Sequence, residues 1–248
     1  MDYKLLASNL IIILCIVTIV FNSLDFKPLR FRCKNYILNS YVYLVLTIAI
    51  FMSILFTMNN IDISQKTFLG IFIVAVFIML VLTIYLLSLS AKKHFLMKHI
   101  LWLLWVICIS YISYPMFKEY NSIFYVAFLY VTLIMFFLTA IVFINPEIVK
   151  EHSWGMSLFI FLLILIIFEL LERYLRYKGY LKDKKYNKML VYVGIILFSG
   201  FVLYDTKVII VNSKKCGHLV DPDYINESIG VFLDFINLLS RVIRIMDE

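Results

Sequence analysis

Glycine, proline and cysteine are scarce in this chain, whose 248 residues include only 7 Gly, 4 Pro and 4 Cys. The glycine-rich phosphate loops and the GxSxG, GxGxxG and HExxH motifs of soluble enzymes are absent, which excludes the common forms of soluble catalysis. The cysteines lack CxxC spacing and two lie inside apolar runs, so we expect neither a disulfide framework nor a zinc site; they are Cys15, Cys33, Cys108 and Cys216. We therefore expect a protein that is not an enzyme and holds no cofactor.

Charged residues are scarce as well. They make up 16% of the chain against 63% hydrophobic residues, and the mean hydropathy is +0.95, far above soluble averages. Few Gly and Pro and no alternation of polar and apolar residues favour membrane helices over a transmembrane barrel. The predicted fold is all-α, a polytopic bundle in the lipid bilayer, with residues 1–30 as an extra N-terminal hydrophobic segment before a domain of residues 31–248. Runs of about 20 apolar residues, the length that crosses a bilayer, lie at 5–22, 36–58, 68–89, 99–116, 121–144, 154–170, 189–211 and 228–246.

Basic residues outnumber acidic residues, and the formal net charge is +7. They are scattered over short loops without an aromatic-interleaved patch, so we expect no nucleic-acid partner. In a membrane protein such residues usually set the orientation, and the early loops 23–35 and 90–98 favour a cytosolic position for their side, against loop 173–188 on the other side. Four histidines at helix ends or in loops are expected to be solvated: His94, His99, His152 and His218.

Ionisable residues inside the apolar runs are the candidates for function, because a charge at membrane depth is unfavourable unless it has a role or a partner. Glu169 has Arg173 one helical turn away, so we expect an interfacial ion pair between them. Lys207 lies four residues from the end of its run and is expected to extend to the lipid head groups.

Asp205 and Asp234 are not explained in this way. The run 189–211 ends at the membrane face at which the run 228–246 begins. Each aspartate lies about six residues, or roughly 9 Å, from that face. The short connection between them permits antiparallel neighbouring helices, with Gly194 and Gly200 as small residues that allow close approach. The two carboxyl groups are therefore expected to lie level with each other and to meet.

The last run carries a polar stripe on an otherwise apolar helix. Its members recur at steps of three and four, which places them on one helical face: Glu227, Gly230, Asp234, Asn237, Arg241 and Arg244. Such a face is expected to line the bundle interior or a watery path, so Asn237, Arg241 and Arg244 are predicted to face a pore.

Two carboxyl groups within hydrogen-bonding reach in a low dielectric tend to share one proton. Protonated, the pair of Asp205 and Asp234 would tie two helices together; doubly ionised, it would repel and offer oxygen ligands for a transient Ca²⁺ contact. The alternative is that the two aspartates are independently satisfied polar residues at helix ends.

The residues around both aspartates resemble a known family. FSGFVLYDTKVII and DYINESIGVFLDFINLLSRVIRIMDE are similar to the C-terminal signature of the transmembrane Bax-inhibitor-motif proteins. FRCKNY resembles the entry to the family's first core helix at Phe31, Lys34 and Tyr36. The lifeguard and Golgi anti-apoptotic branch looks closest, since the lysine-rich tail of the founding Bax inhibitor is absent. The matching signature positions are Gly200, Tyr204, Asp205, Thr206, Tyr224, Leu233, Asp234, Ile236, Asn237 and Leu238.

The resemblance implies a seven-helix core in endoplasmic reticulum or Golgi membranes that leaks Ca²⁺ under a di-aspartyl pH sensor, Asp205 and Asp234, and suppresses apoptosis. The chain departs from the family in its segment 5–22 and in its second core helix, which has no charged latch partner. Arg241 or Arg244 is therefore considered as the basic residue that takes the place of this latch partner. The Ile- and Lys-heavy composition would suit an AT-rich genome, such as that of a large DNA virus.

Two other functions remain open. One is a non-conducting protein that restrains cell-death signalling through membrane protein partners, and self-association into a homo-oligomer fits either function. The other is an intramembrane aspartyl protease, because Tyr204-Asp205 imitates the Y-D motif of that class. The second aspartate lies in Gly230-Val-Phe-Leu-Asp234 rather than G-x-G-D, which argues against a protease.

Overall fold

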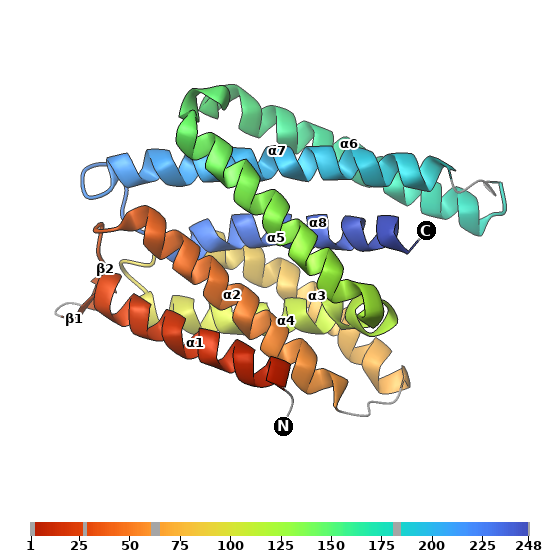
Figure 1. Cartoon of the computed structure of the whole chain (residues 1–248), viewed down its shortest axis with the longest axis horizontal. Helices are drawn as coiled ribbons and strands as arrows, with labels where there is room; N and C mark the ends of the chain where they lie inside the picture. Colours follow the sequence, from red (N-terminus) through yellow and green to blue (C-terminus); the bar gives the residue numbers. More distant parts are fainter. Residues whose placement is uncertain (1–2, 27–28, 61–64, 181–184, 248) are drawn as a thin grey trace. The chain divides into compact units, whose positions relative to one another are not determined.

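The computed structural model describes residues 3–26, 29–60, 65–180 and 185–247. It confirms the predicted all-α fold (Figure 1). Eight α-helices occur in the described part: α1 (Tyr3–Asn22), α2 (Tyr36–Asn59), α3 (Gln65–Ser88), α4 (Phe95–Glu119), α5 (Asn121–Ile144), α6 (Glu151–Tyr177), α7 (Lys185–Lys215) and α8 (Tyr224–Met246). A hairpin of β1 (Leu24–Phe26) and β2 (Leu29–Phe31) and a short helix η1 (Pro146–Ile148) complete the elements.

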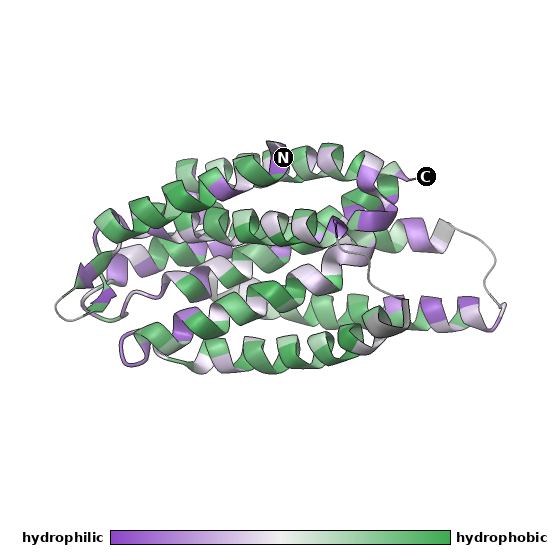
Figure 2. Ribbon diagram, turned by 90° about the horizontal axis from the view of Figure 1, so that it is seen from below, coloured by the Kyte–Doolittle hydropathy of each residue, from purple (hydrophilic) through white to green (hydrophobic). Residues whose placement is uncertain are grey.

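Seven of these helices are long and apolar enough to cross a membrane, from α1 to α7. Hydrophobic residues follow the helices and hydrophilic residues gather at their ends and connections (Figure 2). The eighth predicted run forms a helix, but α8 is not among the seven. Every stretch of membrane-spanning length within α8 contains at least three of Glu227, Asp234, Arg241 and Arg244.

The chain divides into two compact units. Unit 1 comprises Met1–Glu119 and Ile209–Phe232, and unit 2 comprises Tyr120–Val208 and Leu233–Glu248. In unit 1, α1 packs on α2, α2 packs on α4, and α4 packs on α3. Ser53 of α2 donates a hydrogen bond of 2.9 Å to Asn9 of α1, so the N-terminal segment is part of the packing of unit 1.

Several helices extend beyond their predicted apolar runs, and α6 and α7 extend furthest. The run 154–170 belongs to α6, which continues to Tyr177. An ion pair of 2.5 Å between Glu172 and Arg176, one turn apart, supports the added turns. The run 189–211 likewise belongs to α7, which ends at Lys215. Hydropathy therefore located these helices but not their polar ends.

The described part of the loop 23–35 contains the hairpin of β1 and β2. Asp25 of β1 pairs with Arg30 across the hairpin, and its carboxylate also accepts a hydrogen bond of 2.6 Å from Arg32. The hydrogen bond from Arg32 is the main reason that the pKa of Asp25 lies below its usual range. The hairpin leads directly into Cys33.

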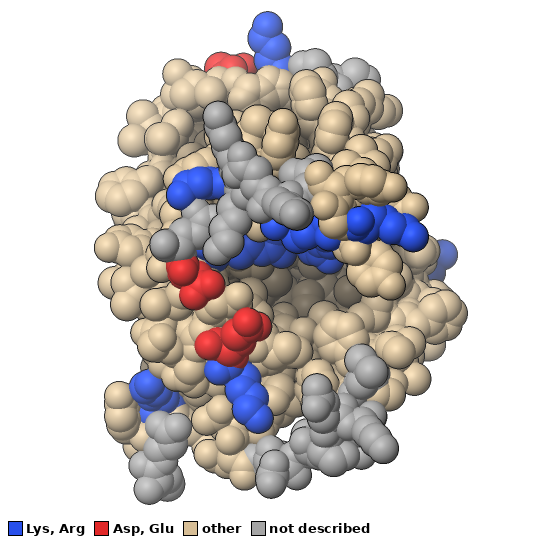
Figure 3. All heavy atoms as spheres, turned by 90° about the vertical axis from the view of Figure 1, so that its right-hand side faces the viewer, with Lys and Arg blue, Asp and Glu red and all other residues tan. Residues whose placement is uncertain are grey.

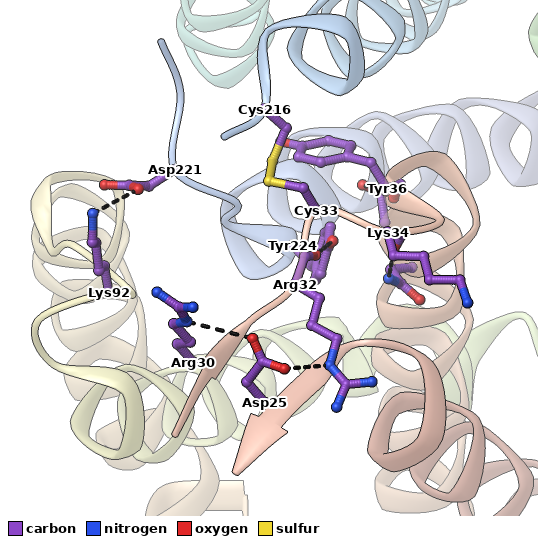
Figure 4. The surroundings of a disulfide bond; sticks show 12 residues. Asp25, Arg30, Arg32, Cys33, Lys34, Tyr36, Lys92, Cys216, Asp221 and Tyr224 are labelled. Carbon is purple, nitrogen blue, oxygen red and sulfur yellow. Dashed lines mark hydrogen bonds and ion pairs between the residues drawn. A yellow bond between two sulfur atoms is a disulfide. The ribbon is translucent and has the colours of Figure 1, made fainter. Parts of the chain in front are cut away.

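The expectation of no disulfide was wrong. Cys33 is bonded to Cys216 at a sequence separation of 183, and the bridge ties the entry of α2 to the end of α7 within unit 1 (Figure 4). Gly217 follows with φ of 84°, a left-handed conformation that favours glycine and turns the chain back after the bridge. Because disulfides persist in oxidising compartments, the bridge favours an orientation opposite to the one indicated by the early basic loops.

Breaking this bridge is expected to lower stability. We expect Cys33→Ser to reduce the free energy of unfolding by about 2–5 kcal/mol, because the bond closes a long loop and restricts the unfolded chain. The measurement is denaturant unfolding in detergent, with and without reductant. Cys108→Ser is the matched control, since Cys108 is a free cysteine. Equal stability of the two variants would contradict the prediction.

His99 also departs from the expected solvated position. Its Nδ1 lies 2.8 Å from the carbonyl oxygen of Phe95, which can only accept, so Nδ1 carries a proton. In the neutral ring Nε2 then accepts from the hydroxyl of Tyr43 at 2.9 Å. Phe31 and Phe95 pack against the same imidazole ring. The side chain of His152 lies outside the described residues.

Candidate functional site

The two aspartates singled out from the sequence lie in the same unit. Asp205 belongs to α7 and Asp234 to α8, and both positions are in unit 2. The structure brings the two carboxyl groups within electrostatic reach, so that a charge on Asp205 acts on Asp234. The central feature of the site is therefore a pair of acidic groups on two helices.

Asp234 is the more enclosed member of the pair. Asp234 is 5% exposed, whereas Asp205 is half-buried. The Oδ2 atom of Asp234 has no hydrogen-bond partner in the described part of the chain. A buried carboxylate oxygen without a donor is unfavourable, and a second negative charge nearby adds repulsion. The site therefore accommodates one negative charge more easily than two.

The neighbours of Asp205 are held by other helices of unit 2. Tyr204 packs against Gly155 of α6, where any side chain would overlap the tyrosine hydroxyl. The hydroxyl oxygen of Thr206 lies 3.5 Å from that of Thr139 on α5. These contacts fix the turn of α7 that carries the aspartate.

Lys207, predicted to extend to the lipid head groups, reaches the connection that follows α5. It is buried, and its Nζ donates a hydrogen bond of 2.7 Å to the carbonyl oxygen of Pro146 in η1. The exposed carboxylate of Glu147 lies 3.4 Å from the same nitrogen. Lys207 thus ties α7 to η1 one half-turn beyond Asp205, which accounts for a lysine in this position.

Glu169 has a different partner from the expected one. Its ion pair is with Arg241 of α8, at 2.8 Å, rather than with Arg173 on its own helix. Arg241 also donates to the carbonyl oxygen of Leu190 at 3.3 Å. The guanidinium lies over the ring of Phe198, with 5.2 Å to the ring centroid. The Arg241 ion pair therefore links α8 to α6 and α7 within unit 2.

The two glycines predicted to allow close helix approach serve different neighbours. A Cβ atom at Gly194 would overlap the guanidinium of Arg241, so this glycine makes room for the ion pair. Gly200 faces Leu158 of α6, 3.0 Å from the position of an added Cβ. The small residues of α7 thus accommodate side chains of α8 and α6.

The remaining members of the polar stripe are less alike than their spacing suggested. Asn237 donates to the carbonyl oxygen of Leu233 at 2.8 Å, a bond within its own helix. Arg244 is half-buried and lines a charged cavity near the end of α8. The three residues do not share one type of environment, because Arg241 is buried in an ion pair.

No group of three or more histidine, cysteine or acidic side chains that could hold a metal ion occurs in the described residues. Asp205 and Asp234 supply oxygen ligands from two residues only. A Ca²⁺ ion takes six to eight oxygen ligands, so this pair fits a brief contact with a passing ion better than a resident ion.

Unit 1 contains a second polar cluster, which was not predicted from the sequence. Lys98 of α4 is fully buried, and its Nζ lies 2.5 Å from Asp223 and 2.5 Å from the carbonyl oxygen of Leu89. Burial raises the pKa of the Asp223 carboxyl above its usual range, although the ammonium of Lys98 acts in the opposite direction. The lysine was placed in a basic loop by composition, and no local pattern pointed to its partner.

The first turn of α8 is anchored in the same unit. Glu227 accepts hydrogen bonds from the hydroxyl of Tyr36, at 2.7 Å, and from Asn212, at 2.8 Å. Tyr224 donates its hydroxyl proton to the carbonyl oxygen of Arg32, beside the disulfide (Figure 4). Tyr36 and Tyr224 were matched to a family signature from the sequence, and their contacts give that match a structural reason.

Two comparisons with known proteins bear on the family of the chain. No match to the chain is found among the curated proteins. A family model described as "Inhibitor of apoptosis-promoting Bax1" matches residues 33–248, which include both aspartates and every helix from α2 to α8. With seven helices apolar enough to span a bilayer, the chain is a multi-pass membrane protein. It belongs to the Bax inhibitor family.

Proposed function

We propose that the protein is a pH-sensitive Ca²⁺ leak channel of endoplasmic reticulum or Golgi membranes, which lowers store Ca²⁺ and thereby inhibits apoptosis. The observation that carries the proposal is the pair of Asp205 and Asp234, whose charges interact while one carboxylate oxygen of Asp234 is buried without a partner. Membership of a family of apoptosis inhibitors supports the cellular part of the proposal.

The pair acts as a proton-dependent latch in this proposal. With one shared proton, one carboxyl group can donate a hydrogen bond to the other, and the bond holds α7 and α8 together at this level. When that proton leaves, two negative charges face each other in a poorly solvated place and repel. The separated carboxylates then present oxygen atoms to a divalent cation.

The contacts around the pair support a local opening. Lys207 ties α7 to η1 close to Asp205, and Arg241 ties α8 to α6 about two turns from Asp234. Both anchors use residues other than the aspartates, so a change at the latch leaves them in place. The opening is therefore proposed at the level of the pair, with both helices held on either side of it.

The test is Ca²⁺ flux in proteoliposomes over a range of pH. We expect the flux of the wild-type protein to rise with pH, by at most about tenfold per unit for one linked proton. Asp205→Asn and Asp234→Asn are each expected to remove this dependence, since an amide does not titrate. Asp221→Asn is the control, because Asp221 is an exposed carboxylate paired with Lys92 in unit 1.

A flux that is absent at every pH, or that keeps its pH dependence in both variants, would overturn the proposal. Protection of cells against apoptosis that survives both substitutions would then favour a non-conducting protein acting through membrane partners.

A further inference from the structure

An apolar groove runs between α6 and α7 in unit 2. Its volume is about 830 Å³, and its walls are apolar except for Ser199. From Trp154 to Phe168 the α6 wall rises by fourteen helical steps, or roughly 21 Å, which exceeds one leaflet of a hydrocarbon core about 30 Å thick. The groove is thus long enough for an acyl chain. Residues that line it include Trp154, Phe161, Phe168, Val193, Gly200 and Leu203.

The groove is open on its outer side. Phe161 is 58% exposed and Ile196 is 74% exposed, and both line it. Because α6 and α7 are long and apolar enough to span the membrane, the surroundings of the groove are lipid. An occupant must therefore be apolar over this length.

One end of the groove carries charge. A second cavity, of about 410 Å³, continues along the same two helices, and Leu190 lines both cavities. Arg173 and Arg244 line this charged cavity, and basic side chains gather on the face drawn in Figure 3. The walls also include Glu169, Glu172, Arg176, Asn187 and Asp247.

Three arginines and three carboxylates line the charged cavity, and Arg241, which is paired with Glu169, adds a fourth guanidinium beside them. Glu172 is paired with Arg176, and Glu169 is paired with Arg241. Arg173 and Arg244 make no ion pair among the described residues; the charge of Glu169 attracts Arg244, and the charges of Arg173 and Arg241 repel it. Glu169 and Glu172 each have a guanidinium partner, which leaves Asp247 as the one lining carboxylate for both Arg173 and Arg244. An anion would offset the remaining positive charge.

We propose that unit 2 binds one anionic glycerophospholipid, with its phosphate between Arg173 and Arg244 and an acyl chain in the groove between α6 and α7. A guanidinium forms two parallel hydrogen bonds to a phosphate group, and basic residues at a membrane surface attract anionic lipids. The apolar groove and the charged cavity meet at Leu190. The chemistry of the site therefore changes from acyl chain to head group along α6, as it does along the lipid.

The test is native mass spectrometry of the purified chain with phosphatidylglycerol or phosphatidylcholine that carry the same acyl chains. We expect preferential retention of phosphatidylglycerol. Arg173→Gln and Arg244→Gln are each expected to reduce that preference by roughly fivefold, the equivalent of about 1 kcal/mol per basic residue. Lys178→Gln is the control, since Lys178 lies just beyond the end of α6 and does not line the charged cavity.

The groove is tested separately by filling it. Val193 lines the groove and Tyr192 does not, although the two are 46% and 47% exposed. We expect Val193→Trp to reduce retention of both lipids and Tyr192→Trp to leave it unchanged. Arg173 is exposed, so Arg173→Gln keeps the charge test valid if Arg244→Gln does not fold.

Equal retention of the two lipids by the wild-type protein would overturn the proposal. Equal lipid retention by Val193→Trp and Tyr192→Trp would also overturn it. So would a dimer that carries no lipid in the wild-type protein and is absent in Val193→Trp, because the groove would then bind a second copy of the chain.

Discussion

Asp223→Ala is expected to reduce the free energy of unfolding by about 3–5 kcal/mol, because it leaves the ammonium of Lys98 buried without a counter-ion. Lys98 is 0% exposed, and its Nζ lies 2.5 Å from the Asp223 carboxylate. The carbonyl oxygen of Leu89, also 2.5 Å away, accepts a hydrogen bond but does not neutralise the charge. Denaturant unfolding of the protein in detergent measures the loss.

Two comparisons separate this effect from the loss of a carboxylate as such. Asp221→Ala removes an exposed pair with Lys92, whose partners are 55% and 56% exposed, and is expected to change stability by about 0–1 kcal/mol. Lys98→Met combined with Asp223→Ala removes both charges and keeps an apolar chain in the site, so it is expected to recover much of the loss. A double variant as unstable as Asp223→Ala alone would contradict the argument.

The same pair shows where sequence reasoning ends. The apolar runs were sufficient to predict the helices and the membrane class, because length and hydropathy are local properties of the chain. Lys98 and Asp223 are 125 residues apart. Cys33 and Cys216, 183 residues apart, have no spacing that marks them as partners. Such contacts depend on how helices pack, and a single sequence does not specify that packing.

Local rules also named the wrong partner where a tertiary contact was available. The one-turn spacing of Glu169 and Arg173 predicted an ion pair on the surface of α6. In the structure Glu169 pairs with Arg241, which is buried in unit 2. A buried guanidinium needs a counter-ion far more than an exposed one does, and Arg173 is exposed. The stripe on α8 predicted that Arg241 faces inward but not which group it would meet.

Asp205 and Asp234 were accessible to sequence reasoning for a different reason. Their equal distance from the ends of two consecutive apolar runs is a statement about depth, which the rise of a helix converts directly into position. Both then fell in unit 2, within electrostatic reach. Depth could be derived from the sequence, whereas the anchors around the pair, Lys207 and Arg241, could not.

Gly194→Ala is expected to lower the free energy of unfolding by about 3–5 kcal/mol, because the added methyl group displaces the side chain of Arg241. An added Cβ would overlap the guanidinium of Arg241, which is held at once by Glu169, by the carbonyl oxygen of Leu190 and by the ring of Phe198. To make room, the guanidinium must leave a buried ion pair, and both charges then lose their partner. The measurement is unfolding in detergent.

Gly70→Ala is the matched control for Gly194→Ala, since Gly70 lies within α3 and an added Cβ there meets nothing within 4 Å. Alanine has the higher helix propensity, so this control is expected to be neutral or more stable by up to about 1 kcal/mol. Glu169→Gln provides an independent route to the same state, because it leaves Arg241 charged without a carboxylate. If the ion pair is what Gly194 protects, adding Gly194→Ala to Glu169→Gln costs less than Gly194→Ala costs alone. Full additivity of the two losses would show instead that the alanine acts on helix packing and not on Arg241.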